Sequence, residues 1–97
     1  MGADLQWSFD MATHSDAMKR TRQNEKRRAR NRHYRSKLRN QTQRVRTAVA
    51  EGDYAAAQEQ FRAAVSIIQR VAQRGVIHRN QAARRIARLS AAVKSIA

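Results

Sequence analysis

The sequence contains no cysteine and no proline, and only three of its 97 residues are glycine. Without cysteine it forms neither a disulfide framework nor a thiolate metal site, and its histidines, His14, His33 and His78, lack the helical spacing of metal ligands. Acidic residues are few and scattered, and no nucleophile stands beside a suitably placed base. We therefore expect no enzyme activity, no catalytic residue, no metal site and no cofactor.

Long apolar runs are missing as well. No stretch approaches the roughly 18 apolar residues that a membrane span needs, and residues 1–15 lack the basic start and apolar centre of a secretory signal. A chain of 97 residues has room for one small domain. The expectation is a single soluble intracellular domain with no membrane partner.

What the sequence has in excess is positive charge. It contains 21 Lys and Arg against seven Asp and Glu, which gives a formal net charge of +14. The excess is concentrated between Lys19 and Arg46, where thirteen cations accompany one acid, Glu25. Like charges at this density repel one another unless an anionic partner screens them, so the sequence predicts a polyanionic partner.

The residue pattern predicts helices only. Ala, Arg, Gln and Lys favour helix, and no stretch shows the period-two alternation of a strand. Gly52 and Gly75 divide the chain after its leader into three stretches. We expect an all-α fold, a three-helix bundle with a long, basic, projecting N-terminal helix. Residues 1–15 are expected to be a disordered leader, in which 1–10 look like an upstream extension, and residues 16–97 a single domain.

The second and third helices have recognisable ends. Asp53 is expected to cap a helix over about 54–73, and Gly75 suits the left-handed position just beyond it. Asn80 is a plausible cap for a third helix that runs to the C-terminus. The residues expected on the apolar face of this third helix are Ala83, Ile86, Leu89, Val93 and Ile96.

The first helix is asymmetric along its length. Leu38, Val45 and Val49 lie within about 60° of Tyr34 around the helix axis and form an apolar stripe. Toward the N-terminus the same stripe is occupied by polar and charged residues such as Arg27 and Asn31, which cannot face an apolar core. Residues 16–33 are therefore expected to project as a basic arm, about 25 Å long if helical.

The arm and a second basic cluster are the candidate binding surfaces. Cations on all sides of a helix suit a cleft between nucleic-acid helices, which favours structured RNA. In the second cluster, Arg84, Arg85 and Arg88 are expected to form a positive strip opposite the apolar face of the third helix. For His78 two interpretations stay open, a loop residue bonded to a nearby carbonyl or a phosphate contact.

Several tracts closely resemble the family of bacterial small-subunit ribosomal protein twenty. They are Lys19-Arg20, Arg22 to Arg28, Arg30-Asn31-Arg32, Gly75 to Asn80, Ala82 to Arg85 and Arg88-Leu89. The resemblance covers about residues 11–97. It implies a structural constituent of the small ribosomal subunit that binds small-subunit (16S-type) ribosomal RNA directly and stabilises its fold during assembly. It also implies a cytoplasmic location in the ribosome, contacts with the 5′ domain and the long penultimate helix of that RNA, few protein contacts and no obligate homo-oligomer.

The candidate RNA-binding residues come from both basic clusters. An alternative from a different class is a nucleic-acid-coating or RNA-chaperone protein without a defined site, for which electrostatic attraction alone would suffice. A solvated basic tail is the other alternative. The candidate residues are Lys19, Arg20, Arg22, Asn24, Lys26, Arg27, Arg28, Arg30, Asn31, Arg32, Arg35, Arg39, Arg74, His78, Arg79, Asn80, Arg84, Arg85 and Arg88.

Overall fold

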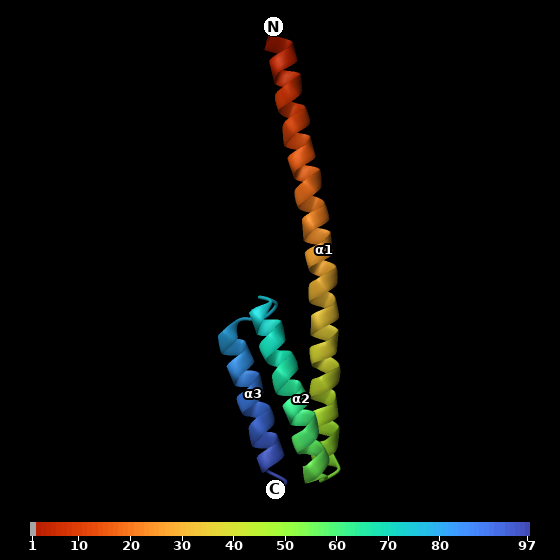
Figure 1. The fold of residues 1–97 in the computed structure, drawn as a ribbon, viewed down its shortest axis with the longest axis vertical. Coiled ribbons are helices and arrows are strands. Elements are labelled where there is room, and N and C mark those ends of the chain that lie inside the picture. Colours follow the sequence, from red (N-terminus) through yellow and green to blue (C-terminus); the bar gives the residue numbers. More distant parts are fainter. Residues whose placement is uncertain (1) are drawn as a thin grey trace. The chain divides into compact units, whose positions relative to one another are not determined.

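The computed structural model describes the backbone of residues 2–97 and the side chains of residues 14–97. Three helices follow one another along the chain: α1 (Gly2–Ala50), α2 (Tyr54–Gln73) and α3 (Arg79–Lys94) (Figure 1). Over residues 2–97 there is no strand, and no helix in this part of the chain is long and apolar enough to cross a membrane. The expected all-α, three-helix fold is confirmed. The other expectation, a leader over residues 1–15, falls mostly on residues 1–13, whose side chains the structure does not describe.

The chain divides into two units, Met1–Asn31 and Arg32–Ala97. In the described part of the first unit, every side chain from His14 to Arg30 is exposed. The second unit holds the apolar core, to which all three helices contribute. The division falls close to Tyr34, where the sequence predicts that the apolar stripe of the first helix stops. Tyr34 itself is half-buried against the core.

The core of the second unit consists of small and medium aliphatic side chains. Val45 of α1 and Ile68 and Val71 of α2 are its largest fully buried side chains, and Leu89 and Val93 add the contribution of α3. Burial of each Val, Leu or Ile stabilises the fold by roughly 1.5–3 kcal/mol. Because few large side chains are available, the helices pack through alanines as well, among them Ala57 and Ala64.

The turn between α1 and α2 is built as the sequence predicts. Gly52 has φ +70 and its N–H donates to the carbonyl of Val49 at 3.0 Å. Asp53 then caps α2, with its Oδ1 accepting from the backbone N–H of Ala56 at 3.1 Å. Gly75, beyond the end of α2, has φ +74. Both glycines therefore occupy the left-handed conformation in which a Cβ would be strained.

The third helix differs from the prediction at both ends and on one face. Its N-cap is His78, not Asn80, because the ring Nδ1 of His78 accepts from the backbone N–H of Asn80 at 3.1 Å. Ala82 is buried, whereas Ala83 is exposed. Helix α3 ends at Lys94 rather than at the C-terminus, and Ser95 forms its C-cap.

One buried polar side chain joins α1 to α2. Gln41 is only 5% exposed. Its Nε2 donates to the backbone carbonyl of Gln60 at 3.0 Å and to the side-chain oxygen of Gln60 at 2.8 Å. A buried amide without partners would be costly, so this pair fixes how the two helices are aligned.

Substitution of Asp53 tests whether its side chain stabilises the N-terminus of α2. Asp53→Ala removes the acceptor for the N–H of Ala56 and is expected to lower the free energy of unfolding by about 1 kcal/mol. Asp53→Asn retains a side-chain oxygen at the same position and is expected to keep most of that stability. Thermal denaturation of both variants is the measurement, and equal losses in the two would contradict a capping role.

Candidate nucleic-acid interface

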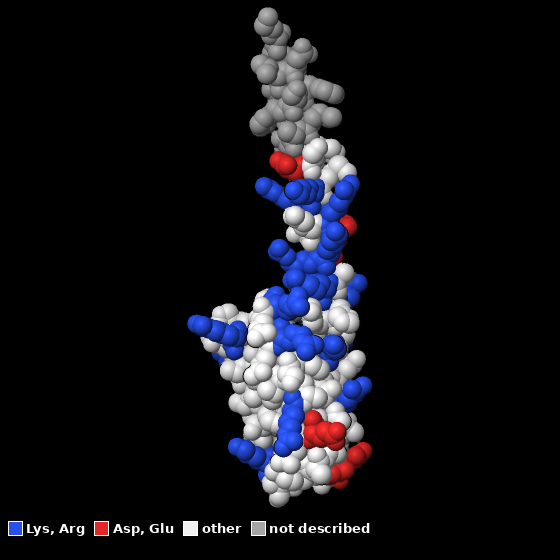
Figure 2. Space-filling view, viewed as in Figure 1, with Lys and Arg blue, Asp and Glu red and all other residues white. Residues whose placement is uncertain are grey.

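The described part of the first unit carries cations around the whole helix. Between residues 19 and 30 there are seven Lys and Arg and one acid, Glu25, and all of these side chains are exposed. At 3.6 residues per turn, and with Arg32 included, no gap between neighbouring cations exceeds about 80° around the axis. Figure 2 shows Lys and Arg over much of the visible face of this stretch. One acid cannot neutralise seven cations, so this helix presents strong positive potential on every side.

Helix α1 and helix α3 enclose a groove in the second unit. A cavity of about 450 Å³ lies between them, and a second of about 150 Å³ shares its residues Thr42, Arg46 and Arg85. We call the two together the arginine groove. Its floor is formed by Leu38, Val76, Ile77 and Leu89. Its polar walls are formed by Arg35, Arg39, Thr42, Gln43 and Arg46 of α1 and by Gln81, Arg85 and Arg88 of α3.

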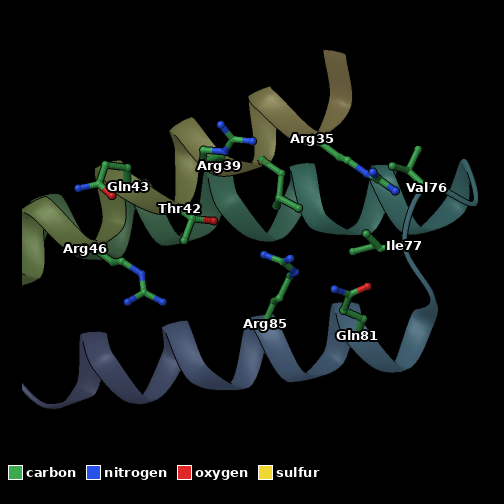
Figure 3. Close-up of a pocket in the computed structure, with 10 residues that line it drawn as sticks. Arg35, Arg39, Thr42, Gln43, Arg46, Val76, Ile77, Gln81 and Arg85 are labelled. Atoms are coloured by element: carbon green, nitrogen blue, oxygen red, sulfur yellow. The ribbon is translucent and has the colours of Figure 1, made fainter. Parts of the chain in front are cut away.

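Polar side chains of α1 and α3 point into the groove from opposite sides. In Figure 3, Arg46 points from α1 toward α3, while Gln81 and Arg85 point from α3 toward α1. Arg35 points toward the connector that carries Val76 and Ile77. No acidic residue lines either cavity. The groove therefore combines positive walls with an apolar floor.

Arg85 lies on a different face of α3 from the one that the sequence analysis assigned to it. We expected it opposite the apolar face, but it is half-buried and its Nε is buried without a hydrogen-bond partner. The reason is that Arg85 and Leu89 are four residues apart and so are neighbours on the helix. Arg84 and Arg88 are exposed, as expected.

The other candidate residues lie outside the groove. Arg74 forms the C-cap of α2, and Arg79 and Asn80 are exposed in the first turn of α3. His78 bonds to a backbone N–H rather than to the carbonyl that one of its two interpretations required. Asn31 is half-buried, and its Oδ1 has no hydrogen-bond partner. The structure thus gathers Arg35, Arg39, Arg85 and Arg88 at one place, and leaves the cations from Lys19 to Arg30 spread along one exposed helix.

Four polar lining residues were not among the predicted site residues: Thr42, Gln43, Arg46 and Gln81. For two of them, Thr42 and Arg46, the sequence does contain a signal. Arg35, Arg39, Thr42 and Arg46 recur at three- and four-residue steps beside the apolar stripe of α1, so they share one face. The sequence does not say which helix packs beside that face, and Gln81 belongs to the groove only because α3 does.

The exposed surface of α2 provides a contrast. Its charged side chains are Glu59, Arg62 and Arg70, all exposed, and none of them lines the arginine groove. Figure 2 shows Asp and Glu side chains gathered near one end of the second unit. The turn before α2 adds two more exposed acids, Glu51 and Asp53. This part of the chain is therefore close to electrically neutral.

Comparison with known proteins gives matches over most of the chain. The model of the family described as Ribosomal protein S20 matches residues 12–94. The small ribosomal subunit protein bS20 of Magnetococcus marinus is 51% identical over 87 residues, which are 90% of this chain and 95% of that protein. Those of Koribacter versatilis and Bordetella petrii are each 48% identical, covering 88% and 90% of this chain and 96% and 100% of their own lengths.

Replacement of Arg85 by methionine tests the geometry of the groove. Arg85→Met removes an unpaired buried Nε and a cation that shares a cavity with three other arginines, while keeping the unbranched stem. We expect the free protein to gain about 0.5–1 kcal/mol, or roughly 2–8 °C in Tm. Arg84→Met, on the exposed face, serves as the control and is expected to leave Tm almost unchanged. A clear loss of stability in Arg85→Met would mean that Arg85 holds a stabilising contact.

Proposed function

The chain belongs to the ribosomal protein S20 family, and from this membership we propose that it binds small-subunit (16S-type) ribosomal RNA directly and stabilises the fold of that RNA during assembly. As a member of this family it is a structural component of the small ribosomal subunit, located with the ribosome in the cytoplasm, and it is not an enzyme. In keeping with the resemblance noted above, the RNA partners are the 5′ domain and the long penultimate helix. Protein contacts are few, and no obligate homo-oligomer forms.

The observation that carries this proposal is the exposed cationic stretch of α1. Residues 19–30 include seven cations and a single acid. The cations point to all sides of the helix, and every one of these side chains is exposed. Such a helix is marginal in isolation, because like charges three and four residues apart destabilise it. Phosphates remove that repulsion, and each neutralised phosphate also releases condensed counterions. RNA binding therefore stabilises the very segment that has no core of its own.

The chemistry of the side chains suits a structured RNA. Arginine outnumbers lysine in this stretch, and its planar guanidinium pairs with phosphate through two parallel hydrogen bonds. Asn24 and Gln23 add donors and acceptors among the cations, and the exposed His33 is available to stack on an unpaired base. Cations on all sides of one helix suit RNA on more than one side of it.

The alternative is a protein that coats nucleic acid without a defined site. Electrostatic attraction by the cationic stretch would serve such a protein equally well. The arginine groove favours the ribosomal role, because a walled cavity with an apolar floor recognises shape, which coating does not require. The nearly neutral surface of α2 also favours the ribosomal role, since a protein that coats nucleic acid is expected to attract phosphate on all of its faces. We infer that α2 faces away from the RNA.

Equilibrium binding of the full chain tests the proposal. The affinity for small-subunit ribosomal RNA is expected to exceed that for a random RNA duplex of equal length, and to fall steeply with salt concentration. The variant Arg27→Gln/Arg28→Gln is expected to reduce the slope of log affinity against log salt by about 1.4–1.8, since each phosphate contact contributes roughly 0.7–0.9. The control Arg62→Gln/Arg70→Gln removes the same charge from α2.

The outcomes separate the two candidate functions. If the control behaves as the original protein while the α1 variant weakens, the cationic stretch of α1 binds the RNA. Equal affinity for ribosomal RNA and random duplex would support coating and overturn the ribosomal proposal. Equal weakening by the two variants would mean that net charge alone sets the affinity.

A further inference from the structure

The arginine groove differs in kind from the cationic stretch of α1. Its walls come from two helices that are distant in sequence, so that Arg46 of α1 and Arg85 of α3 point toward each other's helix (Figure 3). The main cavity, at about 450 Å³, falls within the roughly 300–1,000 Å³ of small-ligand sites in proteins. A groove of this size admits part of a strand rather than a whole duplex.

The walls select an anion. Four arginines and no acid line the main cavity, and Arg88 extends the row into the adjoining one. Thr42, Gln43 and Gln81 contribute neutral hydrogen-bonding groups at the same walls. The buried Nε of Arg85 has no partner within the protein, so a ligand that binds this guanidinium breaks no existing hydrogen bond at that atom. A phosphodiester between the walls would give these cations their counter-charge.

The apolar floor of the groove favours a ligand that has an apolar surface as well as a phosphate. Leu38, Val76 and Ile77 line the same cavity and are 3%, 8% and 9% exposed. An isolated phosphate makes no favourable contact with aliphatic carbon, whereas the face of a nucleobase does. Bases in a duplex are stacked inside it and cannot reach such a floor, but an unpaired base can leave its stack and enter.

From the walls and the floor together we propose that the arginine groove holds one unpaired nucleotide of the ribosomal RNA. Its phosphate lies between Arg46 and Arg85, and its base packs against Leu38, Val76 and Ile77. This inference rests on the proposed function and deepens it, because it assigns a single-stranded element of the RNA to the second unit. It also gives a binding role to Arg46, which lies within the basic region but outside the family-like tracts.

A tethered cleavage reagent tests which RNA element lies in the groove. The chain has no cysteine, so Gln81→Cys at the groove wall creates one unique attachment site for an iron chelate that generates hydroxyl radicals. Ser66→Cys, exposed on α2, is the matched control. With full-length small-subunit ribosomal RNA, the Gln81→Cys conjugate is expected to cut a few nucleotides around one unpaired position. The Ser66→Cys conjugate is expected to cut at least fivefold more weakly.

Binding by a charge-matched pair of variants completes the test. Arg46→Gln/Arg85→Gln is expected to reduce affinity for the same RNA about fivefold at 0.1 M salt. This follows because the one phosphate that the two arginines share contributes roughly 0.7 to the salt slope. Arg62→Gln/Arg70→Gln is expected to change affinity less than threefold. Circular dichroism of each variant verifies that the helices are retained.

Each result has a distinct meaning. Cleavage confined to duplex nucleotides, or equal cleavage from both tethers, would overturn the groove assignment. So would undiminished affinity of Arg46→Gln/Arg85→Gln. In those cases intact binding by the original protein would leave the proposed function standing. Failure of the original protein to prefer ribosomal RNA over random duplex would instead remove the proposed function itself.

Discussion

Repulsion among cations is the constraint on which the rest of this structure depends. The stretch from Lys19 to Arg46 holds thirteen cations and one acid in a single helix. Where that helix has an apolar stripe, burial of Leu38 and Val45 offsets the repulsion. From Lys19 to Arg30 there is no such stripe, every side chain is exposed, and only a partner of opposite charge can offset it.

The C-terminal half of α1 serves two purposes on adjacent faces. One face carries Leu38, Val45 and Ala48 into the core, and the neighbouring face carries Arg39 and Arg46 into the arginine groove. The apolar floor of the groove is therefore continuous with the core that holds the bundle together. A bundle that positions α3 beside α1 brings Arg85 to the same groove, so the fold itself assembles the site from residues far apart in sequence.

Most of the fold could be predicted from the sequence, because its signals are local. Asp53 and Gly75 gave the bounds of α2, and the switch from apolar to charged residues near Tyr34 anticipated the boundary between the two units. Two kinds of feature could not be predicted. The cap of α3 was misassigned because the ring nitrogen of His78 accepts a hydrogen bond as an Asn oxygen would. The groove was missed because helical periodicity places Arg46 and Arg85 on faces without saying that those faces meet.

Amide hydrogen exchange of the full chain, with and without small-subunit ribosomal RNA, tests the central claim most directly. Without RNA, the amides of residues 19–30 are expected to exchange fast while those of residues 57–72 are protected by the core. With RNA, residues 19–30 are expected to gain strong protection, and a random RNA duplex at the same concentration should give much less. Strong protection of residues 19–30 in the free protein, or none in the presence of the ribosomal RNA, would contradict the account.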